Sequence, residues 1–238
     1  MPSIVVNGGR LPALAVVGSL ANASISHVAI LQETASPNHG QKAKVWHTGP
    51  PTKLGECEIH LAGCIDDLTP GEQATLIHEA EDTVSNMPKI AKPKNVAKHH
   101  RRDEMKRQLL SHYSILPPIR EVRDNTTNVL RHRRFSCAGF VVHCYEEGID
   151  VQLVNQEKLP LIGWAEIQRV YATQLANLTE PEIEELGLSK QRVTVNAGLG
   201  WRQTYTENVD SWPILMPSYL LDSVARSSVD IRSTSFQP

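Results

Sequence analysis

The amino-acid sequence predicts an α+β protein in which a small antiparallel sheet packs on helices. Short apolar segments separated by turn residues dominate positions 1–68, and segments with helix caps and helical periodicity follow them. Of the 238 residues, 40% are hydrophobic but only 5% are aromatic, so we expect a core built mainly from Val, Ile, Leu and Ala. This length suits one domain at 1–225, with a basic helical insertion at about 88–118 and a polar tail at 226–238.

The overall charge gives the chain little attraction for polyanions. Lys and Arg number 24 and Asp and Glu number 26, which leaves a formal net charge of −2. We therefore do not expect nucleic acid as a partner of the whole molecule. No run of 18 apolar residues occurs, so we expect no membrane span.

The N-terminal segment lacks the basic start of a signal peptide. The apolar stretch at 11–20 is interrupted by Pro12 and Gly18, and we interpret it as a buried strand or loop. We expect a cytoplasmic protein, or one exported by a route that needs no N-terminal signal peptide. In that setting the four cysteines are expected to be free thiols.

Strands are predicted in the first quarter of the chain. The segments 26–31 and 43–47 are rich in apolar residues, and the turn-forming residues at 33–40 join them as a long hairpin loop. A third strand is expected around 57–62.

Helices are predicted after residue 68. Thr69, Pro70 and Glu72 form the pattern of a capped helix start, so we expect a helix through about Ser85 that ends before Pro88. A second helix is expected to end near Tyr113. Further helices are expected at 135–147, from 165 to about 178 and from 179 to Gly187.

The segment 89–107 is the basic block of the sequence. It carries eight Lys and Arg residues against Asp103 and Glu104. Two interpretations remain open: a solvated helical face, or a site for phosphate or a nucleic-acid backbone. No aromatic residue is interleaved with these charges, so base stacking is not indicated.

Cys137 is the candidate nucleophile. It follows Ser136 at the predicted start of the helix at 135–147, where backbone dipoles favour a thiolate and a free N–H can stabilise an oxyanion. We therefore expect a lowered thiol pKa. A buried structural thiol is the alternative that the segment leaves open.

Two histidines are candidate partners of this thiol. His27 begins an apolar strand and His47 ends the next one, so antiparallel pairing brings both imidazoles to one end of the sheet. A metal site is the alternative, although no further ligand at suitable spacing accompanies them. His143 lies six residues after Cys137 and points away from its sulfur, and His132 belongs to a charge cluster.

The segment Phe-Ser-Cys-Ala-Gly-Phe-Val at 135–141 resembles the Cys-Ser-Gly-Phe-Val nucleophile motif of the NlpC family of papain-like thiol peptidases. The segment Ser-His-Val-Ala-Ile at 26–30 precedes it, and this order is similar to the circularly permuted branch, the YiiX/YaeF-like amidases and the lecithin:retinol acyltransferase-like proteins. Met-Pro-Ser-Tyr-Leu at 216–220 also looks like a segment found near the end of such domains.

The resemblance implies a papain-like fold with Cys137 as nucleophile, His27 as base and His47 as the orienting residue, with no cofactor. It implies a cysteine hydrolase, a peptidase or amidase, that forms a covalent acyl-enzyme on a peptide, a peptidoglycan peptide or an acyl ester. The motifs cover about 30 residues, and 68–134 matches none of them.

Two alternatives to hydrolysis stay open. One is a thiol acyltransferase acting on lipid, and the other is a non-catalytic binding module on the same fold that uses the basic block at 89–107. The sequence leaves the oligomeric state undetermined.

Overall fold

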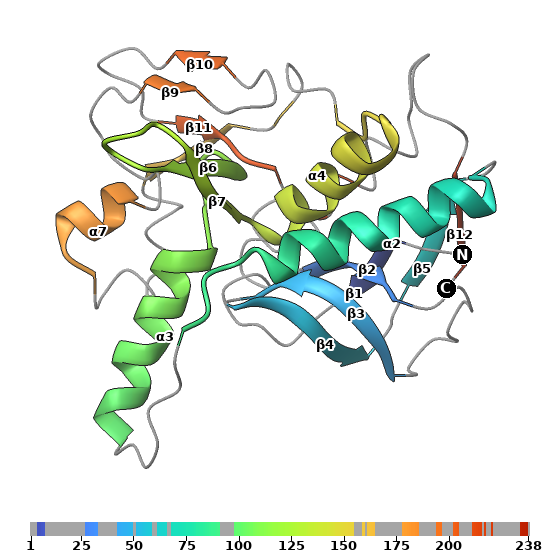
Figure 1. Ribbon diagram of the computed structural model, residues 1–238, viewed down its shortest axis with the longest axis horizontal. Helices are drawn as coiled ribbons and strands as arrows, with labels where there is room; N and C mark the ends of the chain where they lie inside the picture. Colours follow the sequence, from blue (N-terminus) through green and yellow to red (C-terminus); the bar gives the residue numbers. More distant parts are fainter. Residues whose placement is uncertain are drawn as a thin grey trace.

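A computed structural model gives the arrangement of the chain (Figure 1). The structure describes residues 4–7, 27–32, 42–49, 51–58, 61–65, 68–90, 98–154, 159, 161–164, 178–185, 194–196, 202–204, 211–215, 217, 220 and 234–237. Small antiparallel sheets and helices make up these residues, as an α+β fold requires. No helix in these ranges is both long and apolar enough to cross a membrane.

A six-stranded antiparallel sheet is the largest element, with the strand order β12-β5-β1-β2-β3-β4. Its strands are β1 (Ile4–Asn7), β2 (His27–Leu31), β3 (Lys42–Thr48), β4 (Thr52–Glu58), β5 (Leu61–Ile65) and β12 (Thr234–Gln237). The strands predicted at 26–31 and 43–47 are therefore confirmed as β2 and β3. The single strand predicted at 57–62 is wrong, because β4 ends and β5 begins within that range.

The polar tail predicted at 226–238 contains a strand of this sheet. Residues Thr234–Gln237 pair with β5, Phe236 lying opposite Gly63. No sequence pattern indicates this pairing, because a short polar edge strand is stabilised mainly by backbone hydrogen bonds to its neighbour. The apolar stretch at 11–20 lies outside the described residues.

Two helices, α2 (Pro70–Ser85) and α4 (Cys137–Ile149), pack against each other and lie along the sheet (Figure 1). The predicted start of α2 is confirmed: the Thr69 side chain accepts from the Glu72 N–H, and the Glu72 carboxylate accepts from the Thr69 N–H. α4 begins two residues later than predicted. It continues past Gly148 to a left-handed cap at Asp150.

The helix α3 (Lys98–His112) forms about half of the insertion predicted at 88–118 and projects away from the sheet in Figure 1. A hairpin of β6 (Ile119–Arg123) and β7 (Leu130–Phe135) follows it and leads into α4. The short helix α7 (Glu180–Glu185) starts as predicted. It pairs with α3 through Lys106 and Glu182 at 2.8 Å, and with β7 through Arg134 and Glu185 at 2.8 Å.

Four short strands form two further antiparallel pairs. They are β8 (Leu161–Gly163) with β11 (Ser211–Pro213), and β9 (Thr194–Asn196) with β10 (Arg202–Thr204). The helix predicted from 165 to about 178 falls almost entirely outside the described residues. Gly187, the predicted end of the following helix, also lies outside them.

The main hydrophobic core lies between the sheet and the two packed helices. Val28, Ile30 and Trp46 of the sheet contact the buried face of α4, including Phe140 and Val141. The alternate residues Ala29, Leu31 and Val45 form a second cluster on the other face.

Candidate active site

Two buried imidazoles meet at one end of the sheet. Nε2 of His27 lies 3.0 Å from Nδ1 of His47, a hydrogen bond in which one ring donates and the other accepts. The rings are nearly perpendicular at 85°, and only 3% of His27 and 8% of His47 is exposed. The expectation that antiparallel pairing brings these two side chains together is confirmed.

The register of β2 and β3 explains this meeting. Ile30 lies opposite Trp46, and Leu31 lies opposite Val45. If the same register continues by one more pair, His47 lies opposite Ala29. His27 is two residues from Ala29 and therefore points to the same face as His47.

A glycine in the next strand makes room for the His47 ring. A Cβ atom at Gly55 of β4 would lie 2.5 Å from Nε2 of His47. Sequence reasoning did not single out Gly55, and the signal that marks it is a glycine inside a strand, which often indicates close approach by another group.

Cys137 is the first residue of α4, and its position is fixed by the segment before β6. The Ser136 hydroxyl caps the helix by accepting from the Gly139 N–H at 3.0 Å. The Ser136 N–H donates to the Pro118 carbonyl at 2.8 Å, and a Cβ atom at Gly139 would overlap that same oxygen. Gly139 therefore allows the close packing that holds the start of α4 in place.

The sulfur of Cys137 lies where β2 and β3 separate. The Gln32 N–H donates to the Lys44 carbonyl, so the even-numbered residues of β2 direct their N–H groups toward β3. The paired register begins at Ile30, which leaves the N–H of Val28 without a partner in β3. The N–H of Val28 is among the backbone groups that lower the pKa of the Cys137 thiol, which places it near the sulfur. The sulfur thus occupies the end of the sheet at which the imidazoles meet.

The sulfur and the imidazoles approach this end from different sides. Cys137 packs with Val28 and Ile30 on the face covered by α4, whereas strand alternation directs His27 and His47 to the face of Ala29 and Leu31. Among the described residues, Nδ1 of His27 has no hydrogen-bond partner, the Cys137 thiol included. The structure therefore brings the three residues to one place without joining the thiol to the histidine pair.

Burial controls the protonation of all three side chains. It raises the pKa of the Cys137 thiol to about 11, although the N–H groups of Val28, Ala138 and Cys137 lower it. The lowered thiol pKa expected from the helix start is therefore wrong, because the desolvation of a buried thiolate outweighs the helix dipole.

The two imidazoles are neutral at pH 7. Burial lowers the pKa of His27 to about 3, with a further contribution from His47. Burial, followed by the charge of Lys53, lowers the pKa of His47 to about 4. The resting site consequently holds a neutral thiol beside neutral imidazoles and contains no thiolate–imidazolium pair.

The remaining candidates lie elsewhere. His143 is on α4 with its Nε2 3.6 Å from a Glu79 oxygen, and His132 is half-buried in β7. Within the described ranges no group of three His, Cys, Asp or Glu side chains is placed to hold a metal ion. Cys57, Cys137 and Cys144 are free thiols.

The chain was compared with models of protein families, with curated proteins and with solved structures, and none of the three comparisons finds a match.

Proposed function

We propose that the protein is a cysteine hydrolase, a peptidase or amidase, that cleaves an amide or ester bond through Cys137, His27 and His47. The observation that carries this proposal is the buried His27–His47 hydrogen bond at the sheet end where the N–H of Val28 lowers the pKa of the Cys137 thiol. A hydrogen-bonded histidine pair of this kind suits a general base and the group that orients it.

The neutral resting state favours concerted proton transfer. As the sulfur attacks the carbonyl carbon, the thiol proton passes to Nδ1 of His27, the nitrogen that has no partner among the described residues. His47 holds the other nitrogen of His27 and stabilises the imidazolium that forms. His27 then protonates the leaving amine or alcohol, and water hydrolyses the thioester that remains on Cys137.

This sequence of steps requires the site to open. Only 1% of Cys137 is exposed, and the sulfur must meet both the substrate carbonyl and the imidazole that faces the opposite side of the sheet. These steps therefore require His27 to rotate at the open end of the β2–β3 pair until Nδ1 reaches the sulfur. Substrate binding is then coupled to a local rearrangement, as in many enzymes whose catalytic contacts tighten only in the complex.

A small activated ester tests the proposal. The full chain is incubated with p-nitrophenyl acetate, and acetylation is located by mass spectrometry of the peptides. We expect an acetyl group on Cys137, its loss in Cys137→Ala, and acylation slowed about 100-fold or more in His27→Gln. Cys57→Ser and Cys144→Ala are the matched controls, since both remove a free thiol outside the site. Equal acetylation of the wild type and Cys137→Ala refutes the proposal.

The same assay separates hydrolysis from acyl transfer. Adding an amine acceptor leaves the product of a hydrolase as free acetate, whereas a thiol acyltransferase acting on lipid transfers the acetyl group to the amine. Peptide, peptidoglycan-peptide and acyl-ester substrates are then compared with the same Cys137→Ala control.

A binding module using α3 is the second candidate, supported by the projection of this basic helix away from the sheet (Figure 1). Of its charged groups, Lys106 is already paired with Glu182. Replacing Lys98, Arg101, Arg102 and Arg107 by Gln should abolish binding to a phosphate-rich polyanion such as heparin if this candidate is right. Unchanged binding excludes it.

A further inference from the structure

A separate pocket of about 270 Å³ lies between α2, β7 and α4. This volume falls near the lower end of small-molecule sites, which span about 300–1,000 Å³. The described residues that line it include the acidic Glu79 and Asp82 of α2 and the basic Arg131 and Arg133 of β7. His143 of α4 also lines it. His143 follows Cys137 by six residues, about 9 Å along the helix axis, so the pocket is distinct from the thiol site.

The wall formed by α2 carries uncompensated negative charge. Glu79 accepts from the Thr83 hydroxyl at 3.2 Å and Asp82 from the Asn86 amide at 2.9 Å, and both donors are neutral. Among the described residues, the one ion-pair partner of Glu79 is His143, whose pKa burial lowers to about 3. His143 is therefore uncharged at pH 7, and the carboxylates face the pocket without a cation.

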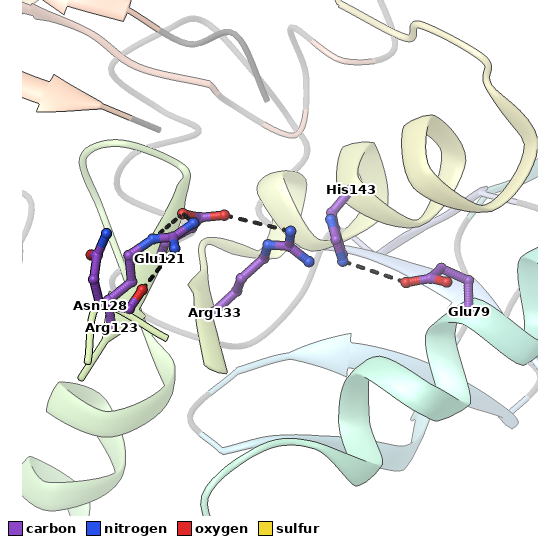
Figure 2. A network of polar contacts seen from close by, with 6 residues as sticks. All are labelled: Glu79, Glu121, Arg123, Asn128, Arg133 and His143. Carbon is purple, nitrogen blue, oxygen red and sulfur yellow. Dashed lines mark hydrogen bonds and ion pairs between the residues drawn. The ribbon is translucent and has the colours of Figure 1, made fainter. Parts of the chain in front are cut away.

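The wall formed by β7 has the opposite charge. Figure 2 shows Glu121 shared between Arg123, which it binds at 2.6 Å, and Arg133, whose Nη2 lies 3.5 Å away. Arg131 pairs with Asp124. Three arginines thus share two carboxylates, which leaves one positive charge in excess.

One buried donor on this side has no acceptor. Nε of Arg133 is shielded from solvent and lacks a hydrogen-bond partner among the described residues. A buried donor without an acceptor is costly, and a bound oxyanion would satisfy it.

We propose that this pocket binds a small zwitterion, with its ammonium group against the carboxylates of α2 and its carboxylate or phosphate against the arginines of β7. One ligand of this kind neutralises the charge of both walls. A simple cation or anion neutralises the charge of one wall and is repelled by the other. The ring of Phe135, whose centroid lies 5.0 Å from that of the tilted His143 ring, contributes apolar surface between the walls.

Isothermal titration of the full chain with four probes tests the inference. Glycylglycine carries an ammonium and a carboxylate, and phosphoethanolamine carries an ammonium and a phosphate; ethanolamine and inorganic phosphate are the single-charge probes. We expect one zwitterion to bind at least about tenfold more tightly than either single-charge probe. The zwitterion that binds more tightly shows whether the pocket prefers a carboxylate or a phosphate. Absence of zwitterion binding, or equal binding of a single-charge probe, overturns the proposal.

Variants locate the binding in this pocket. Asp82→Asn and Arg131→Gln change exposed side chains, so both should fold, and each is expected to weaken zwitterion binding about tenfold. Glu81→Gln and Arg107→Gln are the matched controls, because these exposed residues do not line the pocket. Equal weakening in the controls contradicts the assignment. Cys137→Ala should retain full binding, so failure of the hydrolase proposal leaves this test unaffected.

Discussion

The Cβ position of Gly55 lies 2.5 Å from Nε2 of His47, too close for any side chain at Gly55 to coexist with the present imidazole orientation. Because His47 is hydrogen-bonded to His27, a residue in β4 thereby controls the orientation of the histidine pair. Three further features of the site also lead to measurable consequences.

Gly55→Ala should displace the His47 ring and break its contact with His27. We expect a loss of about 1–3 kcal/mol in the free energy of unfolding, as for other overpacked buried positions. Acetylation of Cys137 by p-nitrophenyl acetate should slow by at least about tenfold, since the base loses its orienting partner. Urea unfolding and peptide mass spectrometry measure the two effects. Gly71→Ala is the matched control, because the nearest atom to its Cβ position is 3.8 Å away.

Gly139→Ala should displace the start of α4 from the Pro118 carbonyl. The added methyl group overlaps backbone, which cannot rotate away, so we expect destabilisation of about 3 kcal/mol or more. The measurement is the midpoint of urea unfolding. A stability within about 0.5 kcal/mol of wild type would contradict the packing described at Ser136 and Pro118.

Thiol labelling should reflect burial. With its pKa raised to about 11 and 1% of its surface exposed, Cys137 is expected to react with iodoacetamide at pH 7 at least about tenfold more slowly than half-buried Cys57. Cys144, buried on the same helix, is the control and should be equally slow. Peptide mass spectrometry at successive times gives the order in which the cysteines are alkylated. Faster labelling of Cys137 than of Cys57 would show an activated, accessible thiol.

Stability should fall as the solution is acidified from about pH 6.5 to 4. The pKa values of His27 and His47 are lowered from 6.5 to about 3 and about 4, so in this range the unfolded chain binds protons that the folded chain does not. Each histidine therefore contributes up to about 1.4 kcal/mol of lost stability per pH unit, and the full contribution is present above pH 6.5.

Urea unfolding at several pH values measures this slope. His27→Asn should reduce it, whereas His78→Asn, at an exposed position of α2, should leave it unchanged. A slope that His27→Asn does not alter would mean that His27 is protonated in the folded protein.

The sequence by itself determined the elements that depend on local chemistry. The capping residues Thr69 and Glu72 and the proline at the first helical position specified α2, and the apolar strands around His27 and His47 specified β2, β3 and the meeting of their imidazoles. Each of these signals acts within a few residues or across one hairpin. Short-range sequence patterns are therefore sufficient to predict these elements.

Only the tertiary structure decided the environment of the site. The pairing of Thr234–Gln237 with β5 and the burial that raises the pKa of Cys137 both join segments far apart along the chain. Desolvation depends on every atom that covers a group, and no local pattern around Cys137 encodes that sum. The helix start predicted a thiolate, but the packing of α4 on the sheet leaves a neutral thiol.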